Sequence, residues 1–517
     1  MSTQTQRNIT ACEMSGESQS AFRIAAYPAP ACAVLRDDWL VQVRPLGGGD
    51  DDWQPLPTYR VRVDGHDPVE ASMAYFDADF AVGAVEVEIR PAHWCVMYAV
   101  DVRPLSYQIK AQVEPKCARF VVDRPVNLSV EVNRNRRHNL HLFAGDLAEV
   151  ERMAAGPDVV IEGNACGPNT IDVVSAARHA LADMAARPAS ERRPVKVLVK
   201  RAHYCVADCV VDLPSGLDVV LEGGVVIDGA FRVRHAHDVS VRGRGVFDLS
   251  GFKRFTGLSG MRIDFSHNVV IDGVTFVNPP HYTVMLGSSD GVTIRNIKSF
   301  SCEGWSDGVD MMACCRVDIE GCFLRTSDDC IAIYGSRWDY RGGTSDVHAR
   351  DCVLWADVAH PMMIGTHGDH EHDGDVLERL EFENIDVLEH NEYQPGYLGV
   401  MDINAGDANT VRDVSWRRIR IEGFRRGRVL DVETKWNKDY NPRPGRLVER
   451  VLVEDVDVDA AGCLDEEPSL IRGYDAEHPV RGVTVRRMRR NGLVCEDFAS
   501  ANIQVDEQTT QNITIQA

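Results

Sequence analysis

The chain has 517 residues, enough for two domains, and carries a formal net charge of −22. That charge argues against a nucleic-acid partner, because phosphate binding needs a basic surface, and mildly against a polyanionic substrate. No apolar run approaches the length of about 18 residues that a membrane span requires, so we expect no membrane partner. Residues 1–8 have no apolar leader core, so we expect a cytoplasmic location and reduced, mostly buried cysteines.

The first 153 residues hold short alternating runs without a repeat. Examples are 59–63 (Tyr-Arg-Val-Arg-Val), 85–89 (Val-Glu-Val-Glu-Ile) and 128–132 (Leu-Ser-Val-Glu-Val), with a Gly/Asp-rich turn at 47–52. Alternation of apolar and polar residues is typical of half-buried strands. We therefore predict an N-terminal antiparallel β-sandwich over residues 1–153, in which 139–144 suits the last strand.

A helix is predicted next, over residues 170–181, from an Ala-rich segment. Its expected role is to cap the open end of the domain that follows, which would otherwise expose a sheet edge. Nearby, Cys205 and Cys209 have no second cysteine pair at zinc-site spacing, which argues against a zinc ribbon.

A short β-type phrase recurs along the rest of the chain. Its copies begin at Val239, Val269, Val292, Val317, Leu380, Val414, Val451 and Val483. Equivalent residues lie 23 apart from Ile271 to Ile294, and 34 apart from Phe382 to Trp416. Such loose repeats predict stacked coils with variable loops. We therefore predict an all-β protein with a right-handed parallel β-helix over 154–517. The alternatives are a β-sandwich or a propeller built from similar short strands, and propeller blades would give a more even period.

Three acidic residues stand out within this repeat. Asp307 lies in 305–310 (Trp-Ser-Asp-Gly-Val-Asp), and the pair Asp328 and Asp329 follows 21 residues later. If that spacing is one coil, the carboxylates lie on rungs about 4.8 Å apart. Clustered carboxylates are suited to acid/base cleavage of a glycosidic bond. Both members of the pair can reach one cleft only if the chain bends between them, and the alternative is that all three are ordinary turn residues.

Five motifs in this order resemble glycoside hydrolase family 28, the polygalacturonase family. They are 245–248 (Gly-Val-Phe-Asp), 278–284 (Asn-Pro-Pro-His-Tyr-Thr-Val), 306–310, 328–329 and 360–365 (His-Pro-Met-Met-Ile-Gly). Trp305 stands where the family has Asn. The resemblance implies that Asp328 is the general acid, that Asp307 and Asp329 activate water, and that the anomeric configuration inverts.

Further residues flank these motifs and are expected to bind substrate: His281, Trp305, Tyr334, Arg337, Trp338, His360, His367 and Asp402. His360 is expected to support the water or a carboxylate, with a structural role as the alternative. Asp310 is expected to close a turn, and Glu433 is a weaker candidate for the cleft. The loop 367–373, with three His and three acids, is a candidate cation site, although we favour a subsite role and expect neither metal nor cofactor.

Two departures from family 28 bear on the substrate. The family's Arg-Ile-Lys motif grips the substrate carboxylate, and its best counterpart, 399–404, places Met401 and Ile403 at the two cations. In addition, a front sandwich is similar to family 49, the dextranase and isopullulanase group, which acts on neutral glucans. We therefore expect an inverting hydrolase of a neutral or weakly charged glycan. The alternatives are a polygalacturonase or rhamnogalacturonan hydrolase, a transglycosylase, and a non-catalytic glycan-binding β-helix; a lyase or epimerase fits the three Asp less well.

Overall fold

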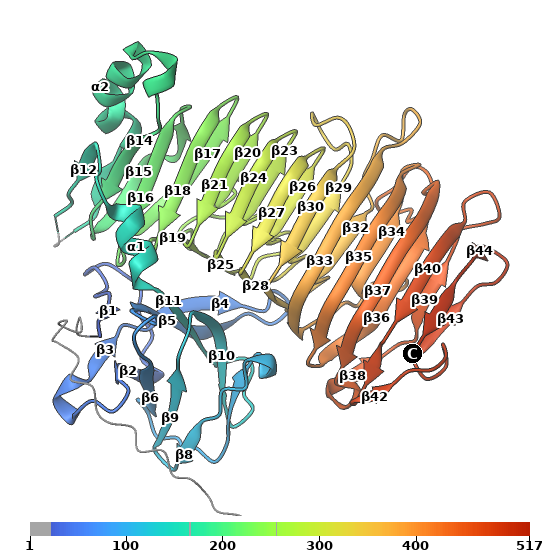
Figure 1. The fold of residues 1–517 in the computed structure, drawn as a ribbon, viewed down its shortest axis with the longest axis horizontal. Helices are drawn as coiled ribbons and strands as arrows, with labels where there is room; N and C mark the ends of the chain where they lie inside the picture. The colour runs from blue at the N-terminus through green and yellow to red at the C-terminus, as the bar shows by residue number, and fades with distance from the viewer. Residues whose placement is uncertain (1–21, 165–166, 255) are drawn as a thin grey trace, which may run out of the picture.

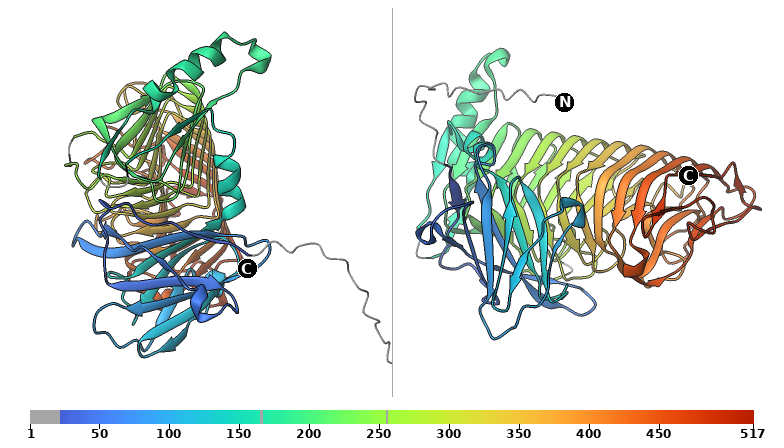
Figure 2. Two further views of the ribbon diagram at one scale, coloured as in Figure 1. Left: turned by 90° about the vertical axis from the view of Figure 1, so that its left-hand side faces the viewer. Right: turned by 60° about the horizontal axis from the view of Figure 1, so that its bottom comes forward.

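The computed structural model describes residues 22–164, 167–254 and 256–517. Its architecture confirms the predicted fold class: a long parallel β-helix with a β-sandwich along one side of its first half (Figures 1 and 2). Residues 1–8, on which the expected location rests, lie outside the described residues. Among the described helices, none has the length and hydropathy needed to cross a bilayer.

The sandwich consists of two sheets. The first has six strands: β1 (Ile24–Ala26), β4 (Tyr59–Val63), β5 (Val69–Ala78), β7 (Val100–Arg103), β10 (Val126–Val132) and β11 (Leu140–Asp146). The second has five: β2 (Trp39–Pro45), β3 (Gln54–Leu56), β6 (Val85–Pro91), β8 (Gln112–Glu114) and β9 (Cys117–Val122). The prediction of an antiparallel module needs one correction, because β5 and β11 pair in parallel. The expected last strand, 139–144, falls in β11.

The first sheet of the sandwich is buried on both faces. Along β5, Ala74 and Phe76 face the second sheet, whereas Met73 and Tyr75 face the β-helix. Adjacent residues of a strand point to opposite sides, so one strand serves both cores. Apolar residues of the β-helix, including Phe323 and Trp355, complete the outer core. Burial on this scale joins the sandwich firmly to the β-helix.

Two α-helices follow the sandwich. The first lies between the sandwich and the β-helix, and the second lies at the start of the β-helix. α1 (Leu147–Ala154) crosses the predicted boundary at residue 153, which stays a prediction. α2 (Val173–Ala186) begins three residues later than predicted, because β13 (Asn169–Ile171) uses the preceding residues and Asp172 caps the helix by accepting from Ser175 N at 2.8 Å. Buried residues of α2 join the core of the first coils, so the expected cap is present (Figure 1).

The repeated phrase forms one face of the β-helix, here called the repeat sheet. Its strands are β16 (Leu217–Leu221), β18 (His237–Gly243), β21 (His267–Asp272), β24 (Asp290–Arg295), β27 (Cys315–Glu320), β30 (Ser345–Arg350), β33 (Val376–Glu389), β35 (Thr410–Ile421), β37 (Leu447–Val458) and β40 (Val480–Arg486). The first apolar residue of each predicted phrase stacks on the next in register, from Val239 to Val483. One coil was missed: Val347 of β30 fills the gap between Val317 and Leu380.

A second face, here called the site sheet, carries the candidate site. Its strands are β20 (Met261–Asp264), β23 (Val284–Gly287), β26 (Val309–Met312), β29 (Ile331–Tyr334), β32 (Met362–Gly365), β34 (Gly399–Ala405), β36 (Phe424–Thr434), β39 (Ser469–Arg472) and β43 (Ile503–Val505). The third face packs against the sandwich. It includes β19 (Val246–Asp248), β22 (Thr275–Val277), β25 (Lys298–Phe300), β28 (Phe323–Thr326) and β31 (Val353–Ala356).

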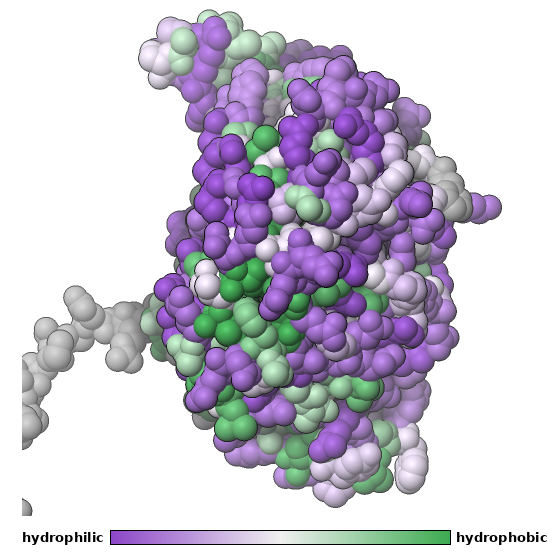
Figure 3. All heavy atoms as spheres, turned by 90° about the vertical axis from the view of Figure 1, so that its right-hand side faces the viewer, coloured by the Kyte–Doolittle hydropathy of each residue, from purple (hydrophilic) through white to green (hydrophobic). Residues whose placement is uncertain are grey.

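The remaining strands close the two ends. The first coils contain β12 (Val159–Ile161), β14 (Val195–Val199), β15 (His203–Leu213) and β17 (Val226–Arg234). The last contain β38 (Cys463–Glu466), β41 (Arg489–Arg490), β42 (Leu493–Val494), β44 (Thr510–Gln511) and β45 (Thr514–Gln516). Seen from the C-terminal end, a mostly hydrophilic surface surrounds an apolar area (Figure 3).

Candidate active site

The three predicted carboxylates meet at one corner of the β-helix. One oxygen from each of Asp307, Asp328 and Asp329 lies within 4.8 Å of the others. Asp307 precedes β26, and the pair lies in a bend between β28 and β29, as the geometry of adjacent strand residues required. Gly308 permits the close stacking of these rungs, because a Cβ there would lie 2.3 Å from the carbonyl oxygen of Cys330.

Asp328 is the most accessible of the three. The other two carboxylates are each 4% exposed, whereas Asp328 is only half-buried. Its oxygens accept hydrogen bonds from the backbone N–H groups of Trp305, at 3.0 Å, and Asp329, at 3.1 Å. Burial and the charge of Asp329 nevertheless raise the pKa of Asp328 to about 7. A carboxyl group that holds its proton near neutrality is suited to act as a general acid.

Asp329 is held by a charged histidine. His360 Nδ1 donates to Asp329 Oδ1 at 2.7 Å, and His360 Nε2 faces the carbonyl oxygen of Tyr397 at 3.2 Å. Because both ring nitrogens face acceptors, the imidazolium form satisfies both contacts. Burial disfavours that form, but the charges of Asp329 and Asp402 outweigh it and raise the pKa of His360 to about 10. The hydroxyl of Tyr334 also donates to Asp329, at 3.2 Å.

Asp310 belongs to this cluster, contrary to its predicted role in a turn. It lies within β26, and neither carboxylate oxygen has a hydrogen-bond partner among the described residues. Burial and the charge of Asp310 raise the pKa of Asp307 well above its ordinary value, and burial and the charge of Asp329 do the same for Asp310. Asp307 and Asp310 therefore hold at least one proton between them.

Aromatic and basic side chains surround the cluster as predicted. Trp305 and Trp338 are 52% and 50% exposed, so both offer ring surface to a ligand. The guanidinium of Arg337 lies 4.3 Å from the ring centroid of Trp338. His281 and Trp338 line a pocket of about 270 Å³. Burial lowers the pKa of His281 to about 4, so this ring is neutral at physiological pH.

Two predicted substrate residues lie behind the carboxylates and do not line the cleft. His360 and Asp402 are fully buried behind Asp329, with His360 Nε2 3.7 Å from Asp402 Oδ2. His360 supports a carboxylate, as expected of it. His367 packs edge-on against Tyr334 at 5.1 Å, and burial lowers its pKa to about 3. Among the described residues, the side chains of its loop, 367–373, do not form a group arranged to hold a metal ion. The weaker candidate, Glu433, pairs with Arg472 at 2.6 Å.

The proposed counterparts of the two cations in the Arg-Ile-Lys motif do not face the cleft. Met401 and Ile403 lie in the apolar interior of the β-helix, so neither can face a substrate. The side chains on the opposite face of β34 are Asp402 and Asn404. Neither carries a positive charge.

The sandwich contributes to the site, which the sequence did not reveal. Gly65, in the turn between β4 and β5, donates its backbone N–H to Ser327 Oγ at 2.8 Å, next to Asp328. In the same turn, His66 packs against Tyr393 at 5.4 Å. Other missed residues lie in long loops without repeat register: Glu392, whose pKa is raised by burial, and Tyr397, whose ring packs against His360.

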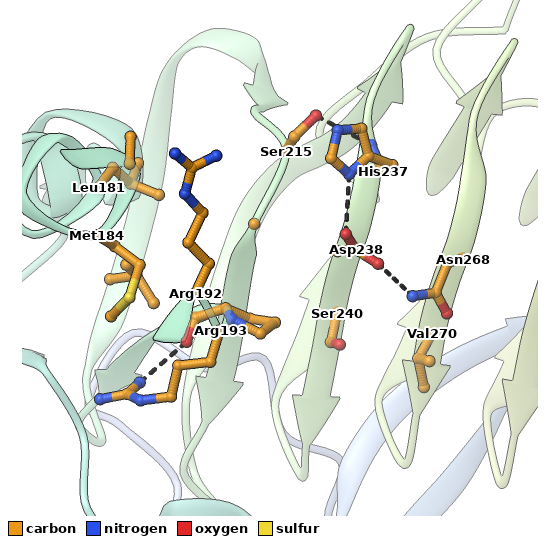
Figure 4. Close-up of a pocket in the computed structure, with 14 residues that line it drawn as sticks. Leu181, Met184, Arg192, Arg193, Ser215, His237, Asp238, Ser240, Asn268 and Val270 are labelled. Atoms are coloured by element: carbon orange, nitrogen blue, oxygen red, sulfur yellow. Dashed lines mark hydrogen bonds and ion pairs between the residues drawn. The ribbon is translucent and has the colours of Figure 1, made fainter. Parts of the chain in front are cut away.

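A different cavity, of about 500 Å³, lies between α2, the turn before β16, and strands β18 and β21 (Figure 4). None of the predicted site residues lines it. Its one carboxylate, Asp238, is paired with His237 at 2.9 Å and with Asn268, so this cavity offers no acid/base cluster.

Comparisons with known proteins relate the chain to glycoside hydrolases. The model of glycosyl hydrolases family 28 matches residues 222–459, which include all three Asp residues. A polygalacturonase from Juniperus ashei is 31% identical over 140 residues, which cover 27% of this chain and 25% of that protein. A probable exopolygalacturonase B from Aspergillus niger is 21% identical over 38% of this chain and 47% of its own length. The chain thus spans about a quarter to a half of these relatives.

Two solved structures share the fold. Dex49A from Penicillium minioluteum has a TM-score of 0.58 and 11% identity, covering 95% of this chain and 96% of that one. The family 28 exopolygalacturonase from Yersinia enterocolitica has a TM-score of 0.50 and 11% identity, covering 83% of this chain and 93% of that one. The predicted resemblance is therefore confirmed, in sequence to glycoside hydrolase family 28 over residues 222–459 and in fold to Dex49A.

Proposed function

We propose that the protein is a glycoside hydrolase that cleaves a neutral or weakly charged poly- or oligosaccharide with Asp307, Asp328 and Asp329. The observation that carries the proposal is the convergence of these carboxylates within 4.8 Å, beside exposed Trp305 and Trp338. Pyranose rings stack on such aromatic faces. The family 28 match supports the same class of reaction.

The different environments of the carboxylates give them different roles in the proposed reaction. Asp328, with a pKa of about 7, donates its proton to the leaving glycosidic oxygen. Asp329, oriented by the His360 imidazolium, accepts a proton from water as it attacks the anomeric carbon. Asp307 shares the water-activating role by resemblance and exchanges a proton with its neighbour Asp310. The C–O bond breaks as the new C–O bond to water forms, and the leaving sugar departs as an alcohol.

Inversion at the anomeric carbon follows from the resemblance to family 28. The spacing of the carboxyl groups by itself points to retention, since the carboxyl groups of inverting enzymes commonly lie about 6.5–9.5 Å apart. The shorter spacing here resembles that of retaining enzymes. Proton NMR of the first product decides the matter: the anomer opposite to the substrate's supports inversion, and the same anomer contradicts it.

The proposed substrate class depends on the side chains that the site sheet presents at its outward face. In family 28 by resemblance, two cations hold a uronate carboxylate, but β34 presents Asp402 and Asn404 at its outward face. A polygalacturonase remains the second candidate because the relatives carry that name. For that substrate, the nearby cations include Arg337, which donates to Tyr282 at 3.0 Å, and Arg254, 4.8 Å from the Trp305 ring.

Reducing-sugar release from a panel of glucans, arabinans, galactans and polygalacturonate tests the proposal. Release from a neutral glycan supports it. Release only from polygalacturonate assigns the second candidate and contradicts the specificity argument. Binding of a glycan without release from any member would assign the non-catalytic role.

A further inference from the structure

A second cluster of polar side chains lies at the start of the β-helix. His203 and Cys205 are in β15, and Asp228 is in β17 on the next rung. Cys205 and Asp228 are partners in the strand register, and His203 precedes Cys205 by two residues, so all three project from the same face. The pairing register shifts immediately after Cys205, which places an irregularity of the sheet beside the cluster.

The distances within the cluster suit a tetrahedral metal ion. His203 Nε2 lies 2.9 Å from Asp228 Oδ2, and Cys205 Sγ lies 3.6 Å from the same oxygen. All three ligand atoms lie within 4.8 Å of one another. Zinc bonds of about 2.3 Å to sulfur and about 2.1 Å to nitrogen and oxygen would separate these atoms by about 3.4–3.7 Å in a tetrahedron. Small side-chain rotations therefore suffice to form the shell.

His203 supplies an independent sign of a ligand. Both ring nitrogens are shielded from solvent, and neither has a hydrogen bond of acceptable geometry among the described residues. The side chain as a whole is 11% exposed. Nε2 faces Asp228 Oδ2 at 2.9 Å, whereas Nδ1 has no polar contact of this kind. A bond from one ring nitrogen to a metal ion would give the shielded ring a further partner.

The three side chains also match the chemistry of zinc. A thiolate, an imidazole and a carboxylate form a donor set that zinc accepts, and a water molecule can complete the tetrahedral shell.

We propose that His203, Cys205 and Asp228 form a zinc site. The site is separate from the carboxylates around β26 and takes no part in cleavage. Its role is structural: the metal ties β15 to β17 on the next coil of the β-helix, which are otherwise held by strand pairing and the α2 cap.

The test uses the full chain, freed of metal by a chelator and kept reduced, and Co²⁺ or Zn²⁺ alone as the probe. Co²⁺ should bind with one equivalent giving a sulfur-to-cobalt charge-transfer band, and Zn²⁺ should displace it and raise the midpoint of thermal unfolding. Cys205→Ser should abolish the band. Cys209→Ser is the matched control, since Cys209 is an exposed thiol of the same strand outside the cluster, and should leave the band unchanged.

His203→Asn provides a second variant should Cys205→Ser fold poorly, which its metal-free unfolding midpoint reports. Absence of a sulfur-to-cobalt band in the wild-type protein would overturn the proposal. So would a band that survives Cys205→Ser, and so would Co²⁺ binding without the band, which would place the metal on oxygen ligands such as the Asp307 cluster.

Discussion

Replacing Gly65 by Ala should slow catalysis from within the sandwich domain. A Cβ at this position would lie 2.9 Å from Ser327 Cβ and 3.3 Å from the carbonyl oxygen of Cys302. Ordinary carbon contacts are about 3.5–4.0 Å, so the turn and the bend that carries Asp328 must separate by roughly 0.6–1.1 Å. The hydrogen bond from Gly65 N to Ser327 Oγ would lengthen with them.

The expected loss follows from that displacement. A misplacement of about 1 Å at a catalytic group costs about 100-fold in rate, which corresponds to about 2.7 kcal/mol in the activation barrier. We expect kcat of Gly65→Ala to fall by about 10- to 100-fold with little change in KM, because the bend holds the acid and not the aromatic subsites. Overpacking should cost about 1–3 kcal/mol in stability, which leaves the chain folded.

Steady-state kinetics on the substrate found by the panel measure this effect, and calorimetry confirms that the variant is folded. The matched control is Gly49→Ala in the same domain, where the nearest atom to a new Cβ is 3.7 Å away. A folded Gly65→Ala protein with kcat within about twofold of wild type would refute the positioning role of this turn.

Three further predictions concern pH, substrate binding and domain docking. Because burial and Asp329 raise the pKa of Asp328 to about 7, and a general acid must be protonated, kcat/KM should fall about tenfold per pH unit above that value; a profile that stays flat there contradicts the assignment. Trp338→Ala should raise KM about tenfold at unchanged kcat, through lost stacking, whereas Trp94→Ala, at a 92% exposed tryptophan of the sandwich, should leave both constants unchanged. Arg103→Ala should lower the free energy of unfolding by about 3–5 kcal/mol in calorimetry, because buried Glu422 loses its ion pair and buried Glu131, in the other domain, keeps only a longer one to Arg136 at 3.6 Å; equal effects from Arg103→Ala and the exposed Arg124→Ala would contradict that reading.

The repeat was readable from the sequence because each coil obeys a local rule. Inward-facing apolar residues such as Val269 and Val292 must stack, so the same short pattern recurs at every rung. The coil at Val347 was missed because only one of its phrase's two usual apolar positions carries a large side chain; Ala349 fills the other. The error at Met401 had a related cause, since a motif matched by letter fixes no strand face until the register is known.

The convergence of the three carboxylates was also predictable, because spacing of one coil brings Asp307 beside Asp328. The residues that support these carboxylates could not be predicted from the sequence. Gly65 and Ser327 are 262 residues apart and meet only through the docking of two domains. Tyr397 reaches His360 from a loop whose length follows no repeat. Contacts of this kind depend on tertiary packing, which leaves no periodic signal in the chain.

The carboxylate cluster is tested most directly by Asp328→Asn, which keeps the shape of the side chain and removes its transferable proton. On the substrate that the panel identifies, the account predicts a fall in reducing-end release of about 100- to 10,000-fold. Asp318→Asn, at a 53% exposed side chain of β27, should retain wild-type activity. An Asp328→Asn protein that still releases reducing ends at the wild-type rate would contradict the account.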